Sequence, residues 1–122
     1  MKYLNRETGR IGEEAAGKFL EDKGLCVVLK NFRTKLGEID LICKDKDVLV
    51  FVEVKTKKGG DFGTPEEMFT RGKYNKVRRM ATLYLKGEEI NCRIDMVAVD
   101  LEENNLVREI RHYANVVYTT NR

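Results

Sequence analysis

Acidic residues interrupt two apolar stretches near the middle of the chain. Residues 37–57 carry Asp40, Glu53 and Lys55 among valine, isoleucine, leucine and phenylalanine. A charge that is buried without a partner costs free energy, so these three residues require a partner or a function. A divalent cation held against a phosphate would supply one, because hard cations bind carboxylate oxygens and keep positions open for water and substrate.

The two acidic stretches are expected to pair as a hairpin around a tight turn at residues 45–48. The simplest register places Asp40 opposite Glu53 and Glu38 opposite Lys55, all on one face. Opposed side chains stand about 4.5–5.5 Å apart at Cβ, where like charges destabilise the pair unless they share a cation. The alternative is a surface hairpin with an ordinary Glu38–Lys55 salt bridge and solvated acids. The apolar residues around Glu53 favour a covered strand with its charges near one end, and ligands gather at strand ends in α/β sheets.

The elements that would position these residues follow from hydrophobic periodicity. Apolar residues at helical spacing predict a first helix over residues 8–23, with Thr8 as its cap and Gly24 as its stop. A second helix is expected to start near Gly72 and to stop at Gly87. Short apolar or alternating runs predict five strands, at residues 25–29, 38–44, 48–56, 93–100 and 106–113. The order αβββαββ indicates an α/β fold with a central mixed five-stranded sheet flanked by helices.

Length and composition set the broad class. The chain has 122 residues, of which 42% are hydrophobic, so one domain over residues 1–122 is expected, with residues 59–64 as a glycine-rich loop. The net charge of +3 is too small to indicate a nucleic-acid partner by itself. The three cysteines have no metal-binding spacing and are expected to be small buried hydrophobes in a reducing compartment. Without an apolar window long enough to cross a membrane, a cytoplasmic protein without a membrane partner is expected.

The acidic pattern resembles the signature of the PD-(D/E)xK nuclease superfamily, in which an Asp ends one strand and ExK follows on the next. Here these residues are Asp40 and Glu53-Val54-Lys55. Much more of the chain resembles the YraN-like family of bacterial proteins, which are similar to archaeal Holliday-junction resolvases. The matching segments are residues 12–16, 31–33, 37–42, 50–55, 62–63, 73–85 and 93–99.

The resemblance implies a restriction-endonuclease-like fold with a metal-dependent site. Asp40 and Glu53 would bind Mg²⁺, or Mn²⁺ in its place, and Lys55 would assist hydrolysis. Resolvases of this type add a glutamate from the first helix, and Glu13 stands at the matching position as a third ligand and catalytic residue. The helical wheel favours Glu13 over Glu14, which lies on the polar side. The alternative for Glu13 is stabilisation of the helix dipole in the first turn.

Basic residues near the hairpin would contact nucleic acid. The first choices are Lys73, Lys76, Arg33 and Lys57, and the alternative is a solvated face of ordinary composition. The predicted function is a metal-dependent endonuclease that hydrolyses phosphodiester bonds in DNA, including branched or structured DNA. The alternative is a nucleic-acid-binding module that keeps the nuclease fold without turnover of its own. A homodimer would suit a four-way junction, by analogy with the resolvases.

Overall fold

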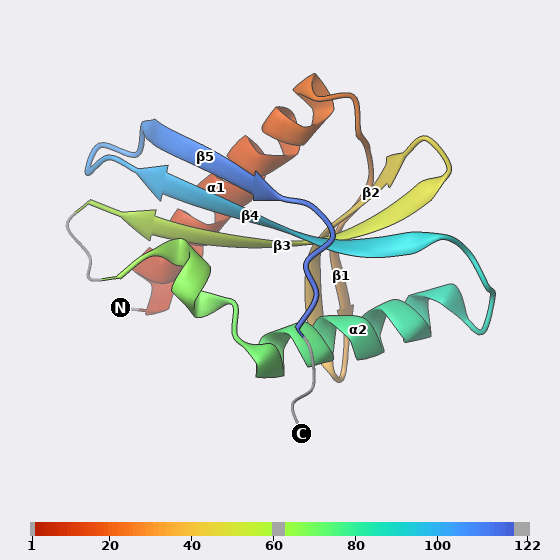
Figure 1. The fold of residues 1–122 in the computed structure, drawn as a ribbon. Helices are drawn as coiled ribbons and strands as arrows, with labels where there is room; N and C mark the ends of the chain where they lie inside the picture. Colours follow the sequence, from red (N-terminus) through yellow and green to blue (C-terminus); the bar gives the residue numbers. More distant parts are fainter. Residues whose placement is uncertain (1, 60–62, 119–122) are drawn as a thin grey trace.

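The computed structural model describes residues 2–59 and 63–118 and confirms the predicted order of elements (Figure 1). Residues 60–62 of the predicted glycine-rich loop lie outside the described part. The elements are α1 (Lys2–Asp22), β1 (Cys26–Thr34), β2 (Gly37–Asp45), β3 (Val48–Lys58), the 3₁₀ helix η1 (Pro65–Met68), α2 (Arg71–Leu85), β4 (Cys92–Leu101) and β5 (Val107–Tyr113).

The five strands form one mixed sheet in the order β1-β2-β3-β4-β5. Every neighbouring pair is antiparallel except β3 and β4, which run parallel and are joined by a crossover through η1 and α2. The helices α1 and α2 cover opposite faces of the sheet (Figure 1). The central strand β3 is therefore buried on both faces, and Val50, Phe51 and Val52 are fully enclosed. This agrees with its continuous apolar sequence.

The predicted end of α1 is confirmed, but its predicted start is wrong. The helix begins at Lys2, so Thr8 lies inside it and caps nothing, because the residues before Thr8 are compatible with helix and extend it. At the other end Gly24 has φ +102°, and the N–H groups of Gly24 and Leu25 donate to the carbonyls of Glu21 and Leu20. These bonds form a Schellman motif, in which glycine takes the left-handed position.

The segment between β3 and α2 contains a short helix that the sequence analysis describes only as a loop. Thr64 accepts a bond from the Glu67 N–H, and the Glu67 side chain accepts from the Thr64 N–H, which makes a capping box around η1. Pro65 occupies the first helical position, where its missing N–H does no harm. The Thr-Pro-Glu-Glu sequence is the signal that would have predicted η1. Helix α2 matches its prediction to within two residues, and Thr70 caps it.

Two expectations about composition have different outcomes. Neither helix of the described residues is both long and apolar enough to span a membrane. Of the three cysteines only Cys43 is buried, whereas Cys26 and Cys92 are exposed, so the prediction of buried cysteines is wrong for those two. Both stand at the first residue of a strand, β1 and β4 respectively.

One buried acid lies on the α1 side of the sheet. Asp95 on β4 is fully enclosed, and its carboxylate accepts bonds from Arg93, the Asn115 N–H and a ring nitrogen of His112. These bonds hold the pKa of Asp95 below its usual value even though burial alone would raise it. Asp95 is thus fully partnered, and its network joins β4 to β5.

Close packing of α1 on β3 depends on Gly12. A Cβ atom built on Gly12 would stand 1.9 Å from Oγ1 of Thr56 and 2.9 Å from its Cβ and Cγ2. No side chain fits there unless the helix or the strand moves. The absence of a Cβ therefore sets the distance between α1 and β3, and with it the position of Glu13 beside the strand.

We expect Gly12→Ala to lower the free energy of unfolding by about 1–3 kcal/mol, because the added carbon overpacks this contact. Alanine favours a helix interior over glycine by about 1 kcal/mol, so a net decrease in the free energy of unfolding would mean that the overpacking outweighs this gain in helix propensity. Urea unfolding measures it. Gly17→Ala is the matched control, since no heavy atom of the described residues lies within 4 Å of a Cβ at Gly17. Adding Thr56→Ala to Gly12→Ala should recover part of the loss; full stability of Gly12→Ala alone would contradict the packing argument.

Candidate active site

The sheet forks at the predicted acidic hairpin. Strands β2 and β3 pair in the predicted register from the turn to Leu41–Val52, where the ladder between them ends. Beyond that point β2 stays paired with β1, whereas β3 stays paired with β4 as far as Lys58. The two halves of the sheet therefore separate at the pair of positions that holds Asp40 and Glu53.

Asp40 marks the point of separation. Its carboxylate accepts a hydrogen bond of 2.8 Å from the backbone N–H of Val54. The Asp40 side chain thus binds the backbone of β3 just beyond the point where the β2–β3 hydrogen-bond ladder ends. The predicted pairing of Glu38 with Lys55 is wrong for this reason. Glu38 instead pairs with Arg33 across β1 and β2, with an ion pair of 3.3 Å. Lys55 forms its ion pair with Glu53 on its own strand, at 3.2 Å.

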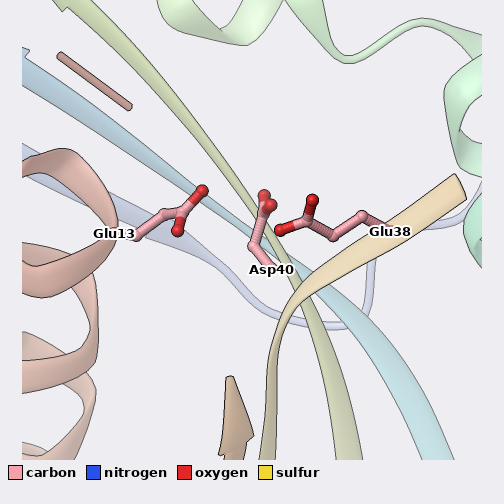
Figure 2. A group of neighbouring side chains, drawn as sticks. All are labelled: Glu13, Glu38 and Asp40. Atoms are coloured by element: carbon pink, nitrogen blue, oxygen red, sulfur yellow. The ribbon is translucent and has the colours of Figure 1, made fainter. Parts of the chain in front are cut away.

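Three carboxyl groups meet beside the fork. Glu13 from α1, Glu38 and Asp40 each offer an oxygen within 4.8 Å of the other two (Figure 2). Asp40 lies between the two glutamates, which point toward it from opposite sides. The side-chain amide of Asn31 donates to both Glu13 and Glu38 and so holds them together. Asn31 has φ +54°, a left-handed conformation that asparagine tolerates better than most residues.

A second group of charges lies along β3. Glu53 is buried, with 8% of its surface exposed, and its ion pair with Lys55 supplies the partner that a buried charge requires. The Lys73 side chain, from the first turn of α2, contacts Lys55. Glu53 is outside the cluster of three carboxylates, although the sequence analysis predicted it as a metal ligand with Asp40 and Glu13.

One pocket joins the two groups. It has a volume of about 530 Å³ and is lined by residues of α1, β2, β3 and η1, among them Glu13, Asp40, Glu53 and Lys55. The four residues predicted to be catalytic are therefore brought together, from three different elements. Lys57 and Lys58 continue the line of β3 along the pocket, and Met68 contributes from η1.

The pocket perturbs the proton affinity of its carboxyl groups. Burial, and then the charge of Glu53, raise the pKa of Asp40 from 3.8 to about 8, although the Val54 N–H acts in the opposite direction. Burial also raises the pKa of Glu53, against the effect of Lys55. Burial of two neighbouring carboxyl groups therefore favours their protonated forms.

The two lysines in contact affect each other in opposite directions. Burial by itself would lower the pKa of Lys55, but Glu53 and the contact with Lys73 raise it above its ordinary value. The hydrogen bond with Lys55, and then its charge, lower the pKa of Lys73. Lys55 is therefore the lysine that holds its proton more tightly, next to the acids.

The four residues predicted to contact nucleic acid lie around the site. Lys57 lines the pocket, and Lys73 reaches Lys55 inside it. Lys76 covers the turn before β2, since a Cβ on Gly37 would lie 3.1 Å from its Cδ. Arg33 is bound to Glu38. Of the four, Lys57 lines the pocket, Lys73 and Arg33 contact residues of the two acidic groups, and Lys76 lies over the start of β2; whether they contact nucleic acid stays a prediction.

Three residues of the site were not predicted as such from the sequence. Glu38 was paired with the wrong lysine, because the hairpin register was continued past the fork. Asn31 gives no charge signal, and its left-handed conformation within a strand cannot be seen in a pattern of apolar residues. Met68 depends on η1, whose capping sequence was overlooked.

The helix η1, which lines one side of the pocket through Met68, is bound to the edge strand β5. Glu66 accepts hydrogen bonds from Arg111 and from the Tyr113 hydroxyl on β5, and Arg111 also donates to Asp100. The hydrogen bonds from Arg111 are the main cause that lowers the pKa of Glu66 to about 2. The contacts of Glu66 with Arg111 and Tyr113 hold η1, and with it Met68, at one side of the pocket.

The fold and the pocket define a mixed α/β protein with an acidic site at the fork of its sheet. The sequence model of Uncharacterised protein family UPF0102 matches residues 12–99, which include every acid of the site. The chain belongs to the UPF0102 family, and this confirms its resemblance to the YraN-like proteins.

Relatives in this family align along most of their length. A UPF0102 protein of Pelotomaculum thermopropionicum is 40% identical over 110 residues, which cover 88% of this chain and 92% of that protein. Another, from Symbiobacterium thermophilum, is 45% identical over 100 residues, with 80% and 85% covered. A third, from Dictyoglomus turgidum, is 33% identical over 114 residues, with 91% and 97% covered.

Asp40 should make the metal-free protein less stable as the pH rises. Its pKa is higher in the folded protein than in the unfolded chain, so the folded state holds the proton more tightly. The resulting stability is present below pH 3.8 and is lost as the pH rises through about 8. Urea unfolding in EDTA between about pH 5 and about pH 8 measures this loss.

Asp40→Asn should flatten that pH dependence, because the amide does not titrate. Asp47→Asn, which makes the same change at an exposed position in the β2–β3 turn, should keep the slope of the natural protein. Equal slopes for Asp40→Asn and the natural protein would contradict the assignment of the raised pKa to Asp40.

Proposed function

We propose that this chain is a metal-dependent endonuclease that hydrolyses phosphodiester bonds in DNA. The observation that carries the proposal is the convergence of Glu13, Asp40, Glu53 and Lys55 in one pocket, from α1, β2 and β3. A binding surface has no need to assemble several carboxyl groups around a lysine, because those carboxyl groups repel phosphate. A hydrolytic site has that need, since the acids can hold a cation that attracts it.

The donor set fits Mg²⁺ or Mn²⁺. Glu13, Glu38 and Asp40 offer hard oxygen ligands that are already within 4.8 Å of one another. Glu53 lies in the same pocket and would join Asp40 and Glu13 as a ligand once it is released from Lys55. Asp40 and Glu13 belong to both possible sets, and Asp40 lies between Glu13 and Glu38 (Figure 2), so it is the residue on which metal binding would depend most. When bound, the ion would lower the pKa of a water molecule and offset negative charge on the phosphate.

The chain's own residues divide the remaining work. Ionised Asp40 stays oriented by the Val54 N–H, which donates to one of its oxygens. Asn31 keeps Glu13 and Glu38 directed at the same point. Lys55 is held beside the acids by Glu53, from where its ammonium can orient the attacking water or stabilise charge on the phosphate.

The proposed substrate is DNA because cationic side chains border the acids. Lys57 and Lys58 line the pocket, and Lys73 extends the positive charge toward α2. Such side chains bind phosphates without reading sequence. Branched or otherwise structured DNA is the preferred candidate, in line with the similarity of YraN-like proteins to resolvases. The alternative within this proposal is a nucleic-acid-binding module that lacks turnover of its own.

The proposal is tested by incubating the protein with linear, flapped and four-way-junction DNA in the presence of Mg²⁺ or Mn²⁺. We expect Asp40→Asn and Lys55→Ala each to reduce the cleavage rate about a hundredfold or more, because each removes a group that acts on the reacting atoms. Asp47→Asn is the matched control and should cleave at the natural rate. Rates are read from the products on a denaturing gel.

The outcomes separate the two functions. Cleavage that survives both Asp40→Asn and Lys55→Ala would show that the activity arises elsewhere. Binding of DNA by the natural protein with no cleavage under either metal ion would favour the module without turnover. Absence of both binding and cleavage would overturn the proposal.

Lys57→Ala should weaken DNA binding and lessen its dependence on salt. Each phosphate contact that is lost reduces the slope of log K against log salt by about 0.9 on duplex DNA. Fluorescence anisotropy at several salt concentrations gives that slope. Lys18→Ala, on an exposed part of α1 outside the pocket, should leave it unchanged. A slope that is the same in all three proteins would remove Lys57 from the interface.

A further inference from the structure

On the face of α1 that is turned to the sheet, the residues become smaller toward the N-terminal end of the helix, where the pocket lies. Leu20 and Ala16 are fully buried against the sheet. One turn further toward the N-terminus Gly12 touches Thr56 of β3. The next position on the same face is Gly9, which lines the pocket that holds the acids. This face of the helix thus has a glycine beside the site.

Gly9 is not explained by packing within the protein. Glycine inside a helix costs about 1 kcal/mol relative to alanine. At Gly12 the close contact with Thr56 explains that cost. At Gly9 no heavy atom of the described residues lies within 4 Å of a Cβ built on the glycine. A side chain would fit there, and it would project into the pocket.

The open space beside Gly9 lies in the same pocket as the acids. Glu13 follows four residues later, so Gly9 and Glu13 are neighbours along one face of α1. Lys57, Lys58 and Met68 also line the pocket, and they come from β3 and η1. The volume of about 530 Å³ lies within the usual range for ligand sites, about 300–1,000 Å³. The pocket therefore has a glycine of α1, between Thr8 and Glu13, on one element and two lysines of β3 on another.

We infer that Gly9 seats the sugar–phosphate backbone of the cleaved strand directly against α1. The inference rests on the proposed function and adds a substrate-contact residue to it. A deoxyribose packs flat on the exposed helix backbone, while the ammonium groups of Lys57 and Lys58 attract the phosphates. Glycine permits this because it allows a ligand to approach the backbone closely. Any side chain at this position would occupy the space of the sugar.

The test compares Gly9→Ala and Gly9→Leu with Gly17→Ala. Gly17 is the matched control, a glycine of the same helix with equally open space, which lines a separate hollow beside Glu14 and Val27. Three quantities are measured for each protein. They are the affinity for labelled single-stranded and four-way-junction DNA in the presence of Ca²⁺, a hard cation that takes oxygen ligands, the affinity for Mn²⁺ alone, and the melting temperature.

We expect Gly9→Ala to raise the melting temperature and yet weaken DNA binding about tenfold, because the added carbon overpacks a filled contact. Gly9→Leu should weaken binding further, and both variants should bind Mn²⁺ as the natural protein does. Gly17→Ala should raise the melting temperature and leave DNA affinity within about twofold of the natural value. Loss of binding in a protein that is more stable cannot come from damage to the fold.

Two results would overturn the inference, and they can be told apart. If the natural protein binds DNA and both Gly9 variants bind it within about twofold as well, Gly9 does not contact the substrate and the proposed function stands. If the natural protein binds neither DNA, the proposed function fails and this inference fails with it. Weaker Mn²⁺ binding in Gly9→Ala would show that the substitution acts through Glu13 instead of through the strand.

Discussion

The hydrogen bond between the Asp40 carboxylate and the Val54 N–H is the contact on which the site depends. It stands at the first position after the β2–β3 ladder ends, where an antiparallel pair would otherwise continue. With the bond in place, β2 leaves with β1 and β3 continues with β4, so the sheet opens between them. The pocket occupies that opening. The same contact therefore ends the sheet and orients the central acid.

Carboxyl groups of like charge lie close together where the sheet separates, and they are compensated by different partners. Glu53 is neutralised by Lys55, and Glu13 and Glu38 share the amide of Asn31. Asp40 has one backbone donor within residues 2–59 and 63–118, the Val54 N–H, and its raised pKa means that a proton offsets the remaining charge. Each acid of the site is thus matched by a proton, an amide or an ammonium group.

The sequence predicted the parts of the structure that depend on periodicity. Apolar alternation located all five strands, and the hairpin turn set the β2–β3 register correctly as far as Leu41–Val52. The register failed beyond that point because a bond from a side chain to the backbone ends the ladder, and such a bond leaves no trace in the pattern. For the same reason Glu38 was assigned to Lys55. The acids of the pocket could be found from the sequence, but their partners in the cluster could not.

The ion pair between Glu53 and Lys55 bears most directly on the choice between hydrolysis and binding alone. Glu53 forms its ion pair with Lys55 and lies outside the cluster of Glu13, Glu38 and Asp40. Lys73 presses a second ammonium group against Lys55, so approach of phosphate between the two lysines would relieve their repulsion and loosen the hold on Glu53. Substrate and metal would then favour each other at this site. A module that only binds nucleic acid would gain nothing from such an arrangement, since its lysines would serve better without the acids beneath them.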